Sequence, residues 1–498
     1  MNTDLPDLPS LPELKLDVDH RIPASWDFDT GVGLILLVPD QKREVLDKAP
    51  WADYLKLRLA DFPRTTNPVL IAGPRGTHTS IGFVSADVQG FKALSQARTL
   101  LAPLLAERLR KINVISLLDR SAPACTLAEA LVSAAYAALF KLPSFAGKAD
   151  DKPPLKAMNF YGEVEAADFR YAKATAEGNN LARWLTQLPG NYLTPAIYRK
   201  YAEALAQQEH WEAEFYDCDQ LQRMAAGAFL SVVQASPHRD AGILQLRYRL
   251  KGGEDQPLAL VGKGICFDTG GSNLKTGNSM LGMQGDMQGS AVALGTLLAL
   301  TRLNFPAPVD CWLALAENHI GPEGAKCNDV VTALNGTTIE LINTDAEGRM
   351  VLADTLALIC RKPPRAILDF ATLTGAVISS LGNRIAGAVT NRRHWIEPVI
   401  QTGEHCGERV WPFPYEDDYD EDLKSQVADT LQCRTAGAAD HIYAARFLGL
   451  FVDKAVGWLH IDMASTGSRE GGLAHIPTDV QGFGVRFGVE WFHRIIAE

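Results

Sequence analysis

The chain of 498 residues is 47% hydrophobic and 21% charged, a composition that is typical of a globular protein with several domains and argues against a disordered or fibrous chain. Its 48 Lys and Arg and 59 Asp and Glu give a net charge of −11 at pH 7, which argues against binding to nucleic acid or to an anionic membrane. No apolar run is long enough to span a membrane and the acidic N-terminus lacks signal-peptide features, so we expect a cytoplasmic protein.

The first part of the chain alternates between strand and helix patterns. Short apolar runs rich in β-forming residues predict strands at residues 31–39, 68–72, 80–85 and 112–118. Apolar residues at helical spacing predict helices at residues 44–60, 90–111 and 127–140. The charged, proline-containing stretch 148–154 then marks a boundary. This alternation predicts an N-terminal α/β domain within residues 1–165.

A helix and a second alternating region follow. Apolar spacing over residues 168–188, stopped by Pro189-Gly190, predicts a helix, and we expect residues 166–190 to form a linker. Apolar runs beyond it predict strands at residues 258–267, 308–316, 365–371 and 457–464. Helices are predicted between them at residues 283–303, 349–361 and 438–452. The pattern predicts a sheet with parallel strands covered by helices on both faces, in a domain of residues 191–498.

The first segment with candidate chemistry is the run at residues 261–275. An apolar strand carries Lys263 and ends in Asp268, and a Gly-Gly turn then leads to Lys275. Residues five apart face opposite sides of a regular strand, so Lys263 and Asp268 meet only if the backbone bulges between them, which Gly264 would permit. A surface hairpin with solvated charges is the alternative. A lysine inside an apolar strand needs a buried partner, however, and this favours a functional site.

Two further segments place carboxylates at helix starts. Asp286 lies at the start of the helix predicted at residues 283–303, where it could also be a simple N-cap. Asp345 and Glu347, two residues apart, point the same way in an extended segment, and Arg349 opens the next helix. Each acidic residue alone could be present because a carboxylate near a helix N-terminus interacts favourably with the helix dipole. This interaction does not explain the whole run of charged residues.

Charge balance predicts a metal site if these segments converge. Four neighbouring carboxylates cannot all remain ionised without cations, and two divalent metal ions would neutralise them. A lysine beside two such ions loses its proton readily, so Lys263 could act as a nitrogen ligand. Lys275 and Arg349 would stay cationic and could stabilise an oxyanion or hold an anion. A zinc site built on His or Cys is poorly supported, because the sequence has no HExxH and its eight cysteines, predicted as reduced thiols, form no CxxC pair.

These residues resemble those of the leucine (cytosol) aminopeptidase family. The resemblance rests on residues 263–271 (KGICFDTGG) and on the octapeptide at residues 343–350 (NTDAEGRM), whose last residue, Met350, replaces the usual Leu. Supporting segments are NYLTP at 191–195, AEN at 316–318, ATLTGA at 371–376 and WLHIDMA at 458–464. The similar region covers roughly residues 168–465.

The resemblance implies a dinuclear metal site and a hydrolytic mechanism. Two Zn²⁺ or Mn²⁺ ions would be held by the five family ligands, which here are Lys263, Asp268, Asp286, Asp345 and Glu347. In the family, a metal-bridging water or hydroxide attacks the carbonyl of the N-terminal residue of a peptide. The matching Lys275 would stabilise the oxyanion, and the matching Arg349 would hold a bicarbonate that shuttles the proton.

The resemblance also implies a substrate, an architecture and an assembly. The substrates are peptides with a free N-terminus, and an apolar first side chain would lie against Met283, Thr372, Leu373 and Ala464, for which core packing is the alternative. The fold class is α/β, with a macro-like N-terminal α/β domain joined by a helix to a larger α/β catalytic domain with a central mixed sheet. The family assembles as homohexamers. A narrow dipeptidase, for instance one acting on cysteinylglycine, and a hexameric DNA-binding or structural protein are the other hypotheses.

Overall fold

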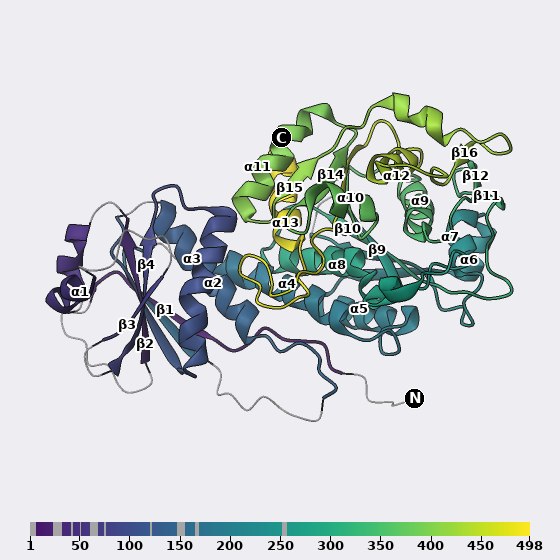
Figure 1. The fold of residues 1–498 in the computed structure, drawn as a ribbon. Coiled ribbons are helices and arrows are strands. Elements are labelled where there is room, and N and C mark those ends of the chain that lie inside the picture. The colour runs from purple at the N-terminus through teal and green to yellow at the C-terminus, as the bar shows by residue number, and fades with distance from the viewer. Residues whose placement is uncertain are drawn as a thin grey trace.

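A computed structural model describes residues 6–22, 32–40, 43–49, 51–59, 68–73, 76–119, 122–146, 155–164, 169–250 and 256–498. Two α/β parts of unequal size lie on either side of a helix, α4 (Arg170–Gln187) (Figure 1). The predicted boundary stretch 148–154 lies outside the described residues. The division of the chain at residues 165 and 190 therefore stays a prediction, whereas the α/β fold class is confirmed.

The N-terminal part is a six-stranded sheet with helices on both faces. Its strand order is β1-β6-β5-β2-β4-β3, and all neighbouring strands are parallel except β3 and β4. The strands are β1 (Lys15–Asp19), β2 (Val32–Pro39), β3 (Val69–Ala72), β4 (His78–Val84), β5 (Lys111–Ser116) and β6 (Ala157–Gly162). The helices are α1 (Ala52–Leu59), α2 (Gly90–Ala106) and α3 (Ala122–Leu139). In Figure 1, α2 and α3 lie on the side that faces the larger part.

All three predicted helices of this part differ in their bounds from the structure, and the one expected at residues 127–140 begins earlier, at Ala122. The helix expected at residues 44–60 is two pieces, the 3-10 helix η1 (Arg43–Lys48) and α1, and Pro50 lies between them in the sequence. A proline has no N–H to donate, so it interrupts helical hydrogen bonding. The helix expected at residues 90–111 ends at Ala106, because Arg108 takes a left-handed backbone conformation and the chain turns into β5.

The larger part is built on an eight-stranded mixed sheet, as expected. The strand order is β15-β14-β17-β13-β9-β10-β8-β7, in which β17, β13, β9 and β10 run parallel. The strands are β7 (Glu212–Asp217), β8 (Gly242–Tyr248), β9 (Leu258–Asp268), β10 (Val309–Asn318), β13 (Ala366–Ala371), β14 (Ala386–Thr390), β15 (Val410–Pro412) and β17 (Gly457–Asp462). A small sheet of β11 (Val330–Thr332), β12 (Thr338–Glu340) and β16 (Thr430–Leu431) lies apart from it.

Helices cover both faces of this sheet. One core cluster contains residues of α4, α5 (Pro195–Glu209), α8 (Gln288–Arg302) and α13 (Val485–Ala497). The other contains residues of α7 (Gly227–Val233), α9 (Glu347–Ile359) and α12 (Asp440–Gly449). Three further helices are α6 (Cys218–Arg223), α10 (Gly375–Leu381) and α11 (Ile396–Cys406). The start of α8 lies directly on β9, because a Cβ atom at Gly262 would meet Ser290 Cα at 2.3 Å.

Helix α4 confirms the helix expected at residues 168–188 and packs deep in the structure. It crosses α8 closely, since a Cβ atom at Gly178 would meet the Gly295 carbonyl oxygen at 2.1 Å. Asn179 Nδ2 also donates to the Gln481 carbonyl oxygen at 3.0 Å. The cysteines are all free thiols, as predicted, and none of the helices in the described ranges has the length and apolarity that crossing a membrane requires.

Candidate metal centre

A bulge in β9 brings Lys263 and Asp268 to the same side of the strand. The register with β10 pairs Ile265 with Ala316 and Asp268 with Asn318, so two residues of β9 lie opposite one residue of β10. The extra residue shifts the alternation of side chains by one position. The predicted bulge is confirmed, but it follows Ile265 and does not fall at Gly264.

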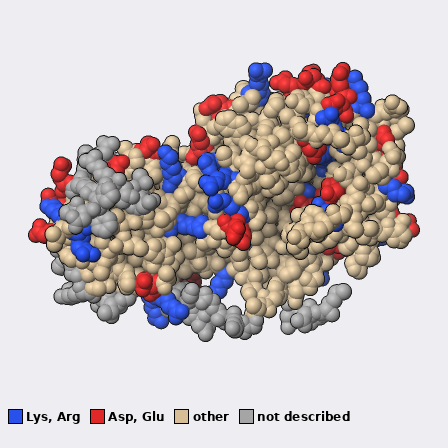
Figure 2. Space-filling view, viewed as in Figure 1, with Lys and Arg blue, Asp and Glu red and all other residues tan. Residues whose placement is uncertain are grey.

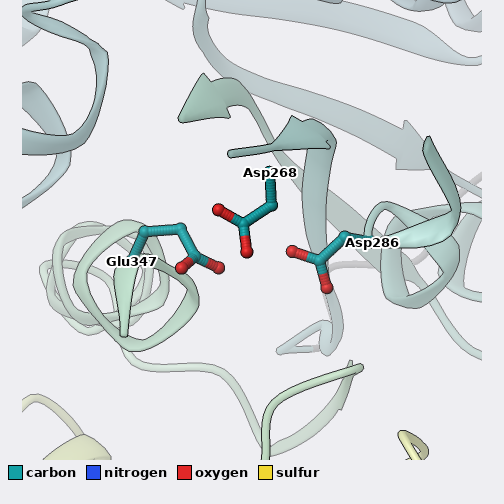
Figure 3. A group of neighbouring side chains, drawn as sticks. All are labelled: Asp268, Asp286 and Glu347. Atoms are coloured by element: carbon teal, nitrogen blue, oxygen red, sulfur yellow. The ribbon is translucent and has the colours of Figure 1, made fainter. Parts of the chain in front are cut away.

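Three buried carboxylates converge beyond the end of β9. Asp268 ends the strand, Asp286 follows the 3-10 helix η4 (Met283–Gly285), and Glu347 is the first residue of α9. Among the described residues, one oxygen from each lies within 4.8 Å of the others, and Figure 3 shows the three carboxylates directed toward one another. Segments that are separate in the sequence therefore meet at one edge of the sheet, where parallel strands end.

The Lys263 side chain lies between two of these carboxylates. Its Nζ is 2.8 Å from Asp286 Oδ2 and 2.9 Å from Glu347 Oε1, and it donates to the Thr372 carbonyl oxygen at 2.8 Å. Burial lowers the pKa of the Lys263 ammonium, but the surrounding carboxylates outweigh burial and hold that pKa above its ordinary value. Gly348 makes room for the side chain, because a Cβ atom there would meet Lys263 Cε at 2.5 Å.

Lys275 joins Asp345 to the three-carboxylate group. Its Nζ lies 2.8 Å from Asp268 Oδ2 and 2.6 Å from Asp345 Oδ1. Asp345 itself is half-buried and stands on the far side of this ammonium. Asn318, at the end of β10, donates from Nδ2 to Asp268 Oδ1 at 2.8 Å. The predicted acidic residues are thus assembled around two ammonium groups, each of which lies between two carboxylates.

The four carboxylates outnumber the two ammonium groups, so their summed charge is negative when all are ionised. Burial, followed by the charge of Glu347, raises the pKa of Asp268 to about 6. Burial also favours the protonated form of Glu347, but the neighbouring Lys263 outweighs it and lowers that pKa. Four carboxylates face two ammonium groups, and the buried Glu347 Oε2 has no hydrogen-bond partner. An oxygen-rich, net negative group of this kind fits divalent cations, with Lys263 as a nitrogen ligand once deprotonated.

Arg349 is buried near the acidic cluster of Asp268, Asp286, Asp345 and Glu347, but its guanidinium contacts other groups. Its Nη2 donates to Asp440 Oδ2 at 2.7 Å and its Nη1 donates to the Gln432 carbonyl oxygen at 3.3 Å. A cavity of about 250 Å³ is lined by Arg349, Asp440 and also Asp345. Arg349 therefore meets the acidic residues only in that it lines the same cavity as Asp345.

Three of the four residues expected to line the substrate pocket, Thr372, Leu373 and Ala464, lie just after β13 and β17. Thr372 Oγ1 donates to Asp286 Oδ1 at 2.8 Å. The backbone N–H groups of Leu373 and Ala464 both donate to Asp462 Oδ1, each at 3.2 Å, which holds the two chain segments side by side. Met283 is half-buried at the start of η4. Their contact with substrate stays a prediction.

Sequence reasoning did not assign roles to three residues that organise this region. They are Asn318, which holds Asp268, Asp462, which ties β13 to β17, and Asp440, which pairs with Arg349. Asn318 and Asp462 lie in segments that match the family, so they could have been named as supporting residues. Nothing in the sequence around Asp440 indicates its partner, which is 91 positions away.

Known proteins resemble the chain in sequence and in fold. A probable cytosol aminopeptidase of Prochlorococcus marinus is 41% identical over 322 residues, which are 64% of this chain and 65% of that protein. One of Nitratidesulfovibrio vulgaris is 36% identical over 396 residues, 76% of this chain and 77% of its own length. The structure of a tomato leucine aminopeptidase mutant covers 99% of both chains with a TM-score of 0.85 and 27% identity.

The match with the first of these relatives spans 65% of its length, and the structural match spans nearly the whole of both chains. The family described as the cytosol aminopeptidase family, catalytic domain, matches residues 180–489, a range that includes β9, α9 and every residue of the acidic cluster. The chain therefore belongs to the cytosol aminopeptidase family.

Proposed function

We propose that the chain is a metal-dependent aminopeptidase that removes the N-terminal residue, with a preference for Leu or another apolar side chain, from peptides. The observation that carries this proposal is the placement of Lys263 and Lys275, each between two carboxylates at the strand ends. Membership of the cytosol aminopeptidase family supports the same reaction.

Five side chains would hold two divalent ions, Mn²⁺ or Zn²⁺. They are Lys263, Asp268, Asp286, Asp345 and Glu347. When bound, the two ions would supply an activated water and polarise the scissile carbonyl. Asn318 and Thr372 hold the Asp268 and Asp286 carboxylates in place through hydrogen bonds of 2.8 Å.

Lys275 is the residue that we assign to the oxyanion. It comes from the loop after β9, its side chain is only 13% exposed, and its ammonium already lies among acidic oxygens. An ammonium group that is largely shielded from solvent stabilises developing negative charge more strongly than one in water. Its neighbours Asp268 and Asp345 raise its pKa, although burial opposes them, so the group keeps its proton.

The substrate must present a free α-amine at the acidic group, which makes the enzyme an exopeptidase. Met283, Thr372, Leu373 and Ala464 would contact the first side chain, and the apolar preference rests on them. We also propose a homohexamer in the cytoplasm as the working form. The resemblance also implied a bicarbonate on Arg349, but the guanidinium already holds the Asp440 carboxylate, so the proposed function does not include this anion.

The test is the hydrolysis of leucine p-nitroanilide by metal-stripped protein before and after addition of Mn²⁺ or Zn²⁺. We expect metal to restore activity in the wild type, and Lys275→Ala to lower kcat by about 100-fold or more because an oxyanion donor is lost. The matched control is Lys200→Ala, an exposed lysine of α5, which should behave as the wild type.

A panel of substrates separates this proposal from its alternative. Hydrolysis of cysteinylglycine alone, with none of the other N-terminal residues accepted, would favour a narrow dipeptidase. Failure of metal to restore any hydrolysis would contradict both. Asp345→Ala should lose activity together with part of the bound metal, measured by elemental analysis, whereas the exposed Asp418→Ala should keep both.

A further inference from the structure

The Arg349 guanidinium is already paired with a carboxylate of this chain. The Asp440 carboxylate accepts a hydrogen bond from Arg349 Nη2 at 2.7 Å, and the arginine side chain is only 2% exposed. A charge-assisted contact to a buried guanidinium is among the stronger polar contacts in proteins. The negative partner of this buried charge is therefore supplied from within the fold.

The backbone holds Asp440 in that position. It is the first residue of α12, and Ala439 before it takes a left-handed conformation with φ of 66°, which turns the chain into the helix. A carboxylate in the first turn also interacts favourably with the helix dipole. Gln432 supplies the second contact of the guanidinium through its carbonyl oxygen, so a protein group faces each of the two Nη atoms.

The charged groups that line the cavity already have partners of opposite charge. The cavity is lined by two carboxylates, Asp345 and Asp440, and by two guanidinium groups, Arg349 and Arg434. Arg349 is neutralised by Asp440, and Arg434 lies 3.6 Å from Asp422. A bicarbonate would have to displace a tethered carboxylate, whose effective concentration far exceeds that of a millimolar free anion. The residues present do not fit a bicarbonate bound to Arg349.

We propose that Asp440 is a built-in replacement for the anion that the family binds at this arginine. Asp440 acts as a positioning residue that holds Arg349 beside the acidic cluster, and hydrolysis by this chain does not depend on bicarbonate. The consequence for activity rests on the proposed aminopeptidase function, but the occupation of Arg349 does not.

The first test measures bicarbonate binding without any reaction, by isothermal titration calorimetry and by the ¹³C resonance of labelled bicarbonate. Wild-type protein should give no saturable heat and no line broadening at millimolar bicarbonate. Asp440→Ala should open the site and bind about one bicarbonate per chain, and Asp440→Glu should again show none. Asp440→Asn removes the charge while nearly preserving the shape of the side chain. Its bicarbonate binding is measured in place of that of the alanine variant if the latter does not fold.

The second test follows leucine p-nitroanilide hydrolysis in buffer freed of CO₂. Wild-type activity should change by less than about twofold on adding bicarbonate, whereas Asp440→Ala should be stimulated by about tenfold or more. Saturable bicarbonate binding to the wild type that is lost in Arg349→Met would overturn the proposal, as would an Asp440→Ala variant that binds none. An inactive protein that shows the expected binding pattern would contradict the aminopeptidase function and leave this inference standing.

Discussion

The position of Lys263 depends on a single residue without a side chain. Gly348 is the second residue of α9, and a Cβ atom there would lie 2.5 Å from Lys263 Cε and 2.7 Å from its Nζ. The glycine of the octapeptide thus lets the helix approach β9 closely enough for Glu347 to reach the lysine. The order Glu-Gly-Arg in the sequence reflects this packing requirement.

We predict that Gly348→Ala disrupts the metal site. Alanine is a better helix former than glycine by about 1 kcal/mol, so helix propensity alone would make the variant more stable. The clash with Lys263 should instead weaken metal binding and lower activity, measured by calorimetric titration with Mn²⁺. Gly375→Ala is the control, because no atom lies within 4 Å of a Cβ there. Unchanged metal affinity in Gly348→Ala would contradict the requirement for this close approach between α9 and Lys263.

At the residue scale, the sequence predicted which charged groups of the site would come together, but not every partner that each of them would have. Lys263, Asp268, Asp286 and Glu347 converge as expected, and Asp345, the fifth residue expected there, is linked to them through Lys275. That expectation was possible because strand ends and helix starts gather at one edge of an α/β sheet. The pairing of Arg349 with Asp440 was missed, since a contact between distant segments leaves no local pattern.

At the scale of the elements, Asp354 connects α9 to its neighbours. Its Oδ2 accepts from the Phe229 N–H at 2.7 Å in α7, and its Oδ1 accepts from the Leu334 N–H at 2.7 Å. The side chain is fully buried and sits two turns beyond the Glu347 end of α9. It therefore fixes the orientation of the helix that carries Glu347.

We predict that Asp354→Ala lowers the free energy of unfolding by about 2 kcal/mol, because two buried N–H groups lose their acceptor. Thermal or urea denaturation measures this change, and Asp418→Ala, an exposed carboxylate, should have no effect. An Asp354→Ala protein as stable as the wild type would contradict the role of this carboxylate as the acceptor for the two N–H groups.

The same carboxyl makes stability depend on pH. Burial raises the pKa of Asp354 to about 7 in the folded protein, whereas an unfolded Asp has a pKa of about 4. The folded state thus binds the proton more tightly, so the contribution of this group to stability falls as pH rises from about 4 to about 7. Asp354→Asn does not titrate, and the stability difference between the two proteins should change in that window. A constant difference from pH 4 to pH 8 would contradict the shift.

Long, apolar or strongly periodic elements were the ones that the sequence predicted. Strand β9 and helix α4 match the expected ranges to within one or two residues. Strand β1 escaped prediction because its sequence, KLDVD, is half-exposed and contains alternating charges. The bulge in β9 could be expected from the need of Lys263 for a partner, but its position after Ile265 depends on pairing with β10.

At the scale of the whole molecule, α3 and α13 join the two α/β parts. Arg486 of α13 is buried and lies 3.0 Å from Glu129 of α3, and its Nε donates to the Cys406 carbonyl oxygen at 2.9 Å. Backbones also meet, since a Cβ atom at Gly90 would lie 1.8 Å from the Glu404 carbonyl oxygen. This contact makes the N-terminal part a support for α13, which packs on α8.

We predict that Glu129→Gln destabilises the protein by up to about 3 kcal/mol, because a buried guanidinium loses its charged partner. Differential scanning calorimetry measures the change, and the exposed Glu44→Gln serves as the control. Metal affinity should stay at the wild-type value, since Glu129 does not touch the acidic cluster. A loss of metal binding without loss of stability would contradict the purely structural role.

The charge distribution over the whole molecule argues against the alternative hypothesis that the chain binds nucleic acid. The chain carries a net charge of −11, and on the face seen in Figure 2 Lys and Arg are interspersed with Asp and Glu. A DNA-binding surface requires an excess of positive charge. Electrophoretic mobility of duplex DNA at physiological salt should therefore be unchanged by micromolar protein, and a clear shift would revive that alternative.

The most direct test of the dinuclear site is anomalous diffraction from crystals loaded with Mn²⁺ or Zn²⁺. We expect two anomalous peaks per chain, with Lys263, Asp268, Asp286, Asp345 and Glu347 as ligands and with the Lys275 ammonium displaced from the Asp268 and Asp345 carboxylates. The absence of any peak at these carboxylates in crystals that hold the metal elsewhere would contradict the account, and so would Lys263 still paired as an ammonium with Asp286 and Glu347.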